Sequence, residues 1–418
     1  MVLLWLTYSL HQIDRAIFAV QYNNIRDELN LTDFQMGLCS QLLFLVMAAL
    51  VPLAGYVGDR YSKKWIITCA LIFWSTATAL TGTAKGIVGL ILFRSFATGG
   101  GEAFYGPAST AMIAAFHKKT RAVALSIHQS AVYFGPMLAA YFGVLIGNAF
   151  GWRSVFFVFG GLGVLLGIVL IYRLREAPAA GDTDREAGEE QPAENEPAPE
   201  KIPFWSAVGQ IIRIPTVLLL TVGFTAIVFV NNAYLTFAPT FIQERFGVSH
   251  FDASFYGMSM HFVAAFIGVM IGAVLADSLV PRWPKFRLIL QTTVMFLGAP
   301  MVFLIGYVDS IHVLWIVLFL FGLFRGLYES NTHAAIFDVV PPKLRAMVVG
   351  LMILAAMTIG SFAPTFFGYL GTLYVSADGV AADGFALAFR LTSLVWILGG
   401  LCVLTTLLFT FKRDRLKD

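Results

Sequence analysis

Charged side chains are scarce in this sequence, and their scarcity is the first guide to the class of protein. Only 13% of the 418 residues are Asp, Glu, Lys or Arg, against about a quarter in a typical soluble protein. Hydrophobic residues make up 58% of the chain, and 38 residues are Phe. This composition excludes a large soluble domain. It indicates a protein that crosses a lipid bilayer many times, and we expect no nucleic acid as a partner.

Cysteines and catalytic motifs are also scarce. The three cysteines, Cys39, Cys69 and Cys402, each lie in an apolar run without the spacing of a metal site or a redox pair. The sequence has no HExxH, no GxSxG and no cluster of Cys and His, and no Gly-Lys-Ser/Thr follows the glycines at 99–101. We therefore expect no disulfide, no metal, no cofactor and no enzymatic activity.

Long apolar runs are abundant. A helix needs about 20 apolar residues to cross the hydrocarbon core of a bilayer. The runs that meet this requirement predict twelve spans, at 2–22, 34–57, 65–84, 87–116, 122–148, 152–173, 212–238, 253–277, 286–307, 311–338, 346–373 and 386–411.

The distribution of Lys and Arg predicts the orientation of these spans. Basic residues gather in the loops after spans two, four, eight and ten and in the C-terminal tail, whereas the alternate loops carry scattered charges. Loops rich in Lys and Arg stay in the cytoplasm. We expect both termini to be cytoplasmic, and the short loops favour the inner (plasma) membrane of a bacterium.

One acidic stretch divides the chain. Residues 176–205 are rich in Glu, Asp, Ala, Pro and Gly, a composition that cannot bury enough apolar surface to fold. We expect a disordered cytoplasmic linker there, between a six-helix bundle at 1–175 and a second bundle with a short basic tail at 206–418.

The two halves resemble repeats of one another. NIRDELNLT at 24–32 aligns with FIQERFGVS at 241–249, and HKKTRAVALS at 117–126 aligns with PPKLRAMVVG at 341–350. Transporters built from such repeats place the substrate site at the interface between the halves.

The loop after span two carries a family signature. GYVGDRYSKK at 55–64 resembles the G-x-L-A-D-R-x-G-R-K loop of the major facilitator superfamily, with departures at three positions. In that family the loop is a conformational latch. The resemblance implies the same role here for Gly55, Asp59, Arg60 and Lys64, whereas Arg94 either lines the cavity or belongs to the latch.

Shorter motifs narrow the resemblance to two branches, the spinster-like lipid transporters and the organic anion/sugar-acid symporters. In those branches an Arg precedes the Glu of span four by seven residues, whereas Arg94 precedes Glu102 by eight. In an α-helix the extra residue turns Glu102 by about 100°, which puts its pairing with Arg94 in question. The motifs are IDRA at 13–16, LTDFQMG at 31–37, GEA at 101–103 and GWR at 151–153.

Ionisable residues inside the spans are the candidate functional groups, because such residues are costly in a bilayer and mark function. Asp14 and Glu102 are candidates for proton coupling, and Arg15 for binding an anionic substrate. A structural ion pair that fixes helix packing is the alternative for Asp14 and Arg15. The glycines before Glu102 permit close helix approach or local unwinding.

Span ten carries a second set. Arg325, Glu329 and His333 recur every four residues and so share one face of a helix. They are candidate substrate contacts, or else an internal salt bridge with a packed histidine. Further candidate substrate contacts are Tyr8, His128, Asn231 and Tyr234.

The predicted fold class is an all-α membrane protein with twelve transmembrane helices in two six-helix bundles. The predicted function is monomeric secondary active transport by alternating access, in which protons drive a small organic anion of the sugar-acid or carboxylate kind. Several arginines in the cavity suit such a substrate. Two alternatives stay open: a spinster-like lipid or lysolipid carrier and, more remotely, a non-transporting solute receptor on the same fold.

Overall fold

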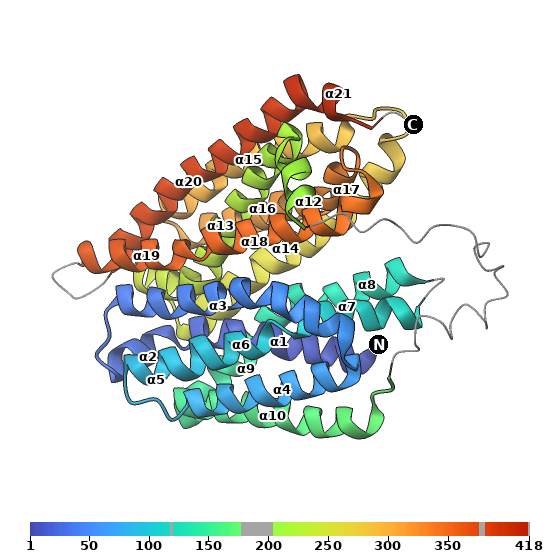
Figure 1. Ribbon diagram of the computed structural model, residues 1–418. Coiled ribbons are helices and arrows are strands. Elements are labelled where there is room, and N and C mark those ends of the chain that lie inside the picture. The colour runs from blue at the N-terminus through green and yellow to red at the C-terminus, as the bar shows by residue number, and fades with distance from the viewer. Residues whose placement is uncertain (118–119, 177–203, 376–380, 417–418) are drawn as a thin grey trace.

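The computed structural model describes residues 1–117, 120–176, 204–375 and 381–416, and within these ranges all regular secondary structure is helical. Figure 1 shows the helices in two groups, with residues 1–176 in one and 204–416 in the other. The first group comprises α1 (Val2–Val20), α2 (Tyr22–Glu28), α3 (Asp33–Arg60), α4 (Lys63–Thr81), α5 (Ile87–Gly89), η1 (Leu90–Thr98), α6 (Gly99–Glu102), α7 (Tyr105–Phe116), α8 (Arg121–Gln129), α9 (Ala131–Phe150) and α10 (Trp152–Arg173). The second comprises α12 (Phe204–Ile212), α13 (Pro215–Phe246), α14 (His250–Leu279), α15 (Phe286–Ile305), α16 (Ile311–Glu329), α17 (Thr332–Phe337), η2 (Pro342–Leu344), α18 (Arg345–Gly360), α19 (Phe362–Leu373), α20 (Ala382–Thr405), η3 (Thr406–Thr410) and α21 (Phe411–Asp414).

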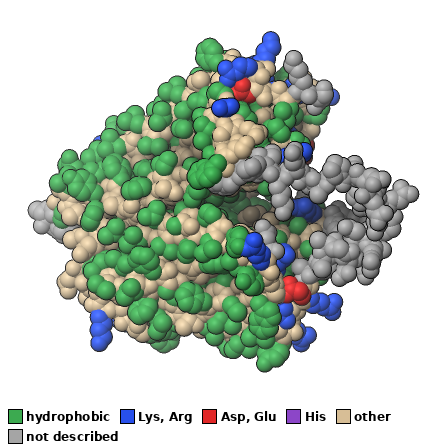
Figure 2. All heavy atoms as spheres, in the orientation of Figure 1, with side chains coloured by type: hydrophobic (Ala, Val, Ile, Leu, Met, Phe, Trp, Pro, Cys, Tyr) green, Lys and Arg blue, Asp and Glu red, His purple; other side chains and the backbone are tan. Residues whose placement is uncertain are grey.

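Eleven of the described helices, several of them built from consecutive segments, are long and apolar enough to cross a membrane. The twelfth long helix is α1, of 19 residues, which carries the polar run His11, Gln12, Asp14 and Arg15. Figure 2 shows hydrophobic side chains covering the flanks of the molecule, where lipid chains would lie. The prediction of twelve transmembrane helices is confirmed.

The seventh span shows why predicted boundaries shift. It was predicted to end at 238, next to Pro239, but α13 runs from Pro215 to Phe246 with Pro239 inside it. Transmembrane helices tolerate proline because neighbouring helices satisfy the freed backbone groups. The helix begins with proline in its first turn, where the missing N–H costs nothing, and ends at Gly247 in the left-handed conformation.

Each group of helices packs as a bundle. Within the first, α1 packs on α9 and α4 packs on α10; within the second, α14 packs on α16 and α15 on α20. The two-bundle arrangement of the predicted fold is confirmed. Most of the predicted linker at 176–205 lies outside the described residues, so those domain boundaries stay a prediction.

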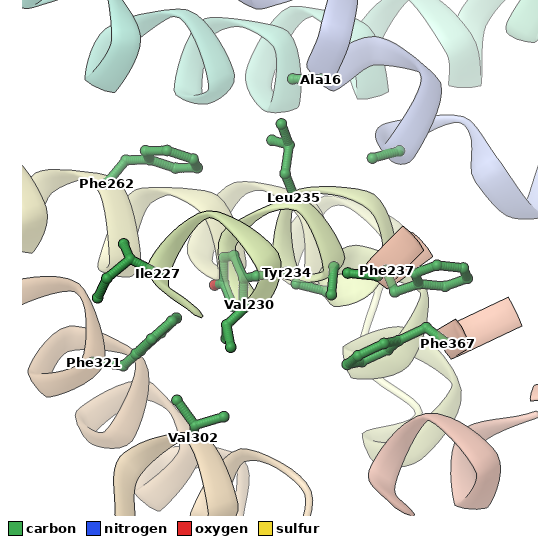
Figure 3. Close-up of a cluster of buried hydrophobic side chains, with 14 of the residues drawn as sticks. Ala16, Ile227, Val230, Tyr234, Leu235, Phe237, Phe262, Val302, Phe321 and Phe367 are labelled. Carbon is green, nitrogen blue, oxygen red and sulfur yellow. The ribbon is translucent and has the colours of Figure 1, made fainter. Parts of the chain in front are cut away.

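Four helix pairs join the bundles: α1 with α13, α9 with α14, α3 with α18, and α3 with α19. At the last pair, a Cβ on Gly37 would collide with the Pro364 carbonyl, and one on Gly368 with the Asp33 carbonyl. At the first pair, Figure 3 shows Leu235 of α13 pointing toward Ala16 of α1. The glycines at 37 and 368 thus let the backbones of α3 and α19 touch, which holds the bundles close at that pair.

The two ends of the molecule differ. Both termini lie at one end, where Figure 2 shows a hollow between the bundles, and we call it the open end. At the opposite, closed end, the Arg26 guanidinium reaches across to Glu244 at 2.9 Å, and the Asn23 amide donates to Gln243 at 3.1 Å. Residues 24–32 and 241–249, which align as repeats, therefore meet each other at the closed end.

Candidate substrate and coupling site

The centre of the first bundle holds a buried carboxylate beside an arginine. Glu102, at the end of α6, is 1% exposed, and its Oε2 lies 3.3 Å from Nε of Arg15 on α1. Neither carboxylate oxygen has a hydrogen-bond partner among the described residues. The Arg15 guanidinium instead donates to the sulfur of Met47 at 2.8 Å and lies over the ring of Phe44. The pair is therefore close but loosely bound.

Arg94 and Asp14 extend this charge cluster. Arg94 donates one hydrogen bond, to the Arg15 carbonyl at 3.3 Å, and lies over the ring of Phe18. Its Nε and Nη1 atoms, and Oδ1 of Asp14, have no hydrogen-bond partner among the described residues. Buried polar groups are nearly always hydrogen-bonded, so a cluster with this many unpartnered atoms is unusual and points to a functional role.

A π-helical segment explains how Glu102 reaches this cluster. Residues Leu90–Thr98 form π-helix, whose wider turns take up an extra residue. The eight-residue spacing from Arg94 therefore does not turn Glu102 away as it would in a plain α-helix. No ion pair links Arg94 directly to Glu102 within the described residues; the carboxylate faces Arg15 instead.

The predicted role of the glycines is visible at α6. A Cβ on Gly101 would collide with Trp74 of α4, and a Cβ on Gly99 would lie 3.0 Å from the Leu43 carbonyl of α3. Small residues here let three helices approach closely around Glu102.

Arg15 and Arg94 line a small cavity of about 10 Å³ between the bundles. Its opposite wall is formed by Leu235 and Thr236 of α13. This volume holds about one water molecule. The arginines therefore face the junction of the two bundles, which is where transporters of repeated halves bind their substrates.

Aromatic and imidazole rings gather on the side of Glu102 nearer the open end. The Tyr8 and His128 rings stack at 4.5 Å, and the Tyr105 hydroxyl lies 2.9 Å from Nε2 of His128. His11 Nε2 lies 3.6 Å from Oε2 of Glu102. Tyr105 was not among the predicted candidates. His11 was considered only as a single histidine on a membrane helix, which more often packs than binds, although a further signal was available: it precedes Arg15 by four residues and so shares its face of α1.

The second bundle contains a comparable arginine with full partners. Arg325 donates from Nε and Nη2 to Oε1 of Glu329, at 3.0 and 2.9 Å, and its Nη1 lies 2.9 Å from Nε2 of His261. Glu329 also accepts a hydrogen bond across the bundles from Tyr133 of α9, at 3.1 Å. His261 was noted in the sequence as a polar group on span eight, but a single histidine on an apolar helix more often packs than binds, so it was not carried into the predicted site.

The remaining predicted contacts are dispersed. α16 ends at Glu329, so His333 lies beyond a break, in α17, and is exposed. Asn231 is partly buried with its side-chain carbonyl unpartnered. Tyr234 is fully buried; its hydroxyl donates to the Gly257 carbonyl, and Figure 3 shows its ring among apolar side chains.

The predicted latch residues do not form one group. Arg60 lies over the ring of Tyr56 and Lys64 near that of Trp65, around the loop between α3 and α4. Arg94 lies in the charge cluster instead. Gly55 has open space around it, and the side chain of Asp59 lies outside the described residues.

The closed end carries a second network of charges. Arg26 lies between Asp33 and Glu244, and Tyr22 donates to Asp33 at 2.9 Å. Burial alone would lower the pKa of the Arg26 guanidinium, but these two carboxylates raise that pKa above its ordinary value. Arg26 therefore stays charged at any physiological pH and holds the two bundles together.

Two helical bundles with buried, incompletely paired charges between them define a membrane carrier. A family model described as Major Facilitator Superfamily matches residues 4–365, and the chain belongs to that superfamily. It is therefore a multi-pass membrane transporter and not an enzyme.

Three relatives illustrate the range of this family. The chain is 24% identical to protein spinster homolog 1 of Xenopus tropicalis, over 99% of this chain and 81% of that one. It is 23% identical to a probable galactarate/D-glucarate transporter of Escherichia coli (strain K12), over 88% of this chain and 86% of that one. It is 26% identical to a probable sulfoacetate transporter of Cupriavidus necator, over 87% and 85% of the two chains.

Among solved structures, the chain resembles a bacterial homolog of the human lysosomal transporter spinster in an inward-facing and unoccupied conformation. The TM-score is 0.85 with 23% identity, covering 100% of this chain and 98% of that one. The likeness establishes the fold.

Proposed function

We propose that this transporter couples the movement of protons to that of a small organic anion, of the sugar-acid or carboxylate kind, by alternating access. The observation that carries the proposal is Glu102, a buried carboxylate close to an arginine yet without a hydrogen bond from any described residue on either oxygen. Such a group can take up a proton without breaking a hydrogen bond.

The geometry suggests how proton and anion cooperate. An ionised Glu102 neutralises Arg15, which lies 3.3 Å away. A protonated Glu102 leaves the charge of Arg15 unbalanced in a medium of low dielectric constant, where a substrate anion would stabilise it. Protonation and anion binding then favour each other, and this reciprocity is what a symporter requires.

Roles for the other residues follow from their positions. Asp14 lies in the same cluster and serves as a second proton-coupling group. Arg15 is the primary anion-binding group. Arg325 and Glu329 are already bonded to each other, so they have a supporting role in the second bundle. Tyr8, His128, Asn231, Tyr234 and His333 remain further candidate substrate contacts.

The relatives support this substrate class, since two of them are named for the transport of galactarate/D-glucarate and sulfoacetate, which are small organic anions. The basic loops beside the termini support a cytoplasmic open end and a bacterial inner membrane. A lysolipid carrier is the second candidate, favoured by the likeness to spinster proteins along the whole chain.

The test uses purified protein in liposomes. Uptake of radiolabelled D-glucarate, D-galactonate and sulfoacetate is measured with and without an inward proton gradient, and uptake of lysophosphatidylcholine is measured in parallel. Gradient-stimulated uptake of one of the three anions is the expected result. Transport of lysophosphatidylcholine alone would replace the proposal with the lipid carrier, and anion uptake indifferent to the gradient would remove its proton-coupled part.

A further inference from the structure

Ionisable rings form a series that leads from Glu102 toward the open end. His11 lies one turn nearer the N-terminus of α1 than Arg15, and Tyr8 lies three residues further. Tyr105 of α7 lies within 5.7 Å of Tyr8 and 6.0 Å of His11, measured between ring centroids. His128 of α8 stacks on Tyr8. Figure 1 shows the N-terminus of α1, α7 and α8 on the side of the open end.

The first member of the series faces the carboxylate directly. Nε2 of His11 lies 3.6 Å from Oε2 of Glu102, the same oxygen that faces Nε of Arg15. The other ring nitrogen, Nδ1, lies 3.3 Å from the side-chain amide of Gln12. Gln12 has both a donor and an acceptor, so it can partner Nδ1 in either tautomer of the ring. Nε2 of His11 is thus free to give or to accept a proton at Glu102.

The hydrogen bonds between the last members of the series, Tyr105 and His128, have a defined direction. The Tyr105 hydroxyl donates its hydrogen to the Leu4 carbonyl at 2.7 Å. It must therefore accept from Nε2–H of His128, at 2.9 Å. Nδ1 of His128 is then a proton acceptor, and it is buried without a hydrogen-bond partner among the described residues. A histidine of low exposure with its accepting nitrogen unused is poised to receive a proton.

We propose that His11 is the relay that carries the proton between Glu102 and the open end, with His128, held by Tyr105, as the next acceptor. The inference rests on the proposed proton coupling and adds a route to it.

The transfer is balanced at each step. A protonated Glu102 gives its proton to Nε2 of neutral His11, which leaves a carboxylate and an imidazolium. The imidazolium passes one proton through water to Nδ1 of neutral His128, which becomes an imidazolium in turn. His128 then releases a proton to the open end, and both rings return to the neutral form.

The charges around His11 favour brief protonation of its ring, as a relay requires, over lasting protonation. Arg15 opposes a lasting positive charge on His11, whereas the carboxylate of Glu102 stabilises the charge while it is present. The titratable and charged groups that face His11 from its neighbours are Tyr8 and Arg15 on α1, Glu102 on α6, Tyr105 on α7 and His128 on α8.

The test follows the proton without a substrate. The infrared carboxyl band of Glu102, identified by its loss in Glu102→Gln, is recorded after a rapid rise in pH. We expect the band to decay at least about tenfold more slowly in His11→Gln than in the wild type, because positioned acid–base groups typically contribute about 10²–10⁴-fold to proton transfer. His312→Gln is the matched control, since His312 is an exposed histidine outside the site.

A second variant separates a relay from a packing role. In His11→Ala, added imidazole should restore the fast decay, and the restoration should follow the concentration of neutral imidazole. An unchanged decay in His11→Gln would overturn the proposal, as would slow decay in His11→Ala that imidazole does not restore. Both outcomes are independent of anion uptake, so failure of the relay and failure of the proposed transport function are distinguishable.

Discussion

Each bundle contains an arginine beside a glutamate, and the two pairs differ in how completely they are bonded. In the second bundle, three nitrogens of Arg325 have partners, and Glu329 accepts from both Arg325 and Tyr133. In the first, neither oxygen of Glu102 accepts a hydrogen bond from the part of the chain that the structure describes. A satisfied pair holds its geometry, whereas a carboxylate without hydrogen bonds can change its protonation without breaking any. From this difference we propose that coupling belongs to the first bundle and structural support to the second.

The largest expected effect comes from removing the charge of the unsatisfied carboxylate. Glu102→Gln keeps the shape of the side chain but cannot release a proton. We expect gradient-driven anion uptake to fall by about a hundredfold or more, while exchange of labelled for unlabelled anion persists. Uptake and exchange in liposomes measure both. Loss of exchange with normal gradient dependence would contradict the assignment. Glu28→Gln, at an exposed pair with Arg153, is the control.

Removal of the arginine should be nearly as severe. Arg15→Ala deletes the group that the account gives to the anion. A charged hydrogen bond is worth about 1.5–3 kcal/mol, so the affinity should fall by about ten- to a hundredfold. Thermal stabilisation by D-glucarate measures the change. Arg15→Lys should recover part of the affinity, because lysine keeps the charge but lacks the planar guanidinium that binds a carboxylate through two hydrogen bonds. Wild-type affinity in Arg15→Ala would remove Arg15 from the site.

The satisfied pair should respond differently. Glu329→Gln leaves Arg325 with its charge unbalanced, and the expected loss of folding stability is about 1–3 kcal/mol. The melting temperature should therefore fall, while the remaining uptake keeps its dependence on the proton gradient. A variant of normal stability whose uptake ignores the gradient would reverse the roles given to the two bundles.

The smallest effect is expected where the bundles touch at the closed end. Asn23→Ala removes one neutral hydrogen bond to Gln243, worth about 1 kcal/mol. The population open at that end should rise about fivefold. Electron–electron distance measurements between spin labels at the exposed positions 85 and 312 report this population. An unchanged distribution would show that the bond contributes nothing to closure.

The sequence predicted the features that depend on local composition. Apolar runs located the spans, and charges inside those runs located Glu102, Arg15 and Arg325. The predicted end of the seventh span, at 238, was wrong, since α13 continues through Pro239 to Phe246. A membrane helix tolerates an internal proline only where neighbouring helices satisfy its backbone, which the local sequence does not show.

Features that depend on three-dimensional contact could not be predicted. Tyr105 was missed, and His261 was noted only as a polar group on an apolar helix, because both owe their places to helices far apart in the sequence. The spacing of Arg94 and Glu102 was noticed, but its outcome depends on a π-helical turn that periodicity cannot predict. The ion pair between Arg26 and Glu244 at the closed end was also not predicted, although its two residues lie in the aligned repeats at 24–32 and 241–249.

Proton flux driven by the substrate tests the central claim most directly. A pH-sensitive dye inside the liposomes reports protons that enter when D-glucarate or D-galactonate is added outside, for the wild type and Glu102→Gln side by side. The account predicts anion-dependent acidification in the wild type and none in the variant, although the variant still exchanges the anion. Equal acidification in the two proteins would show that the proton is carried elsewhere.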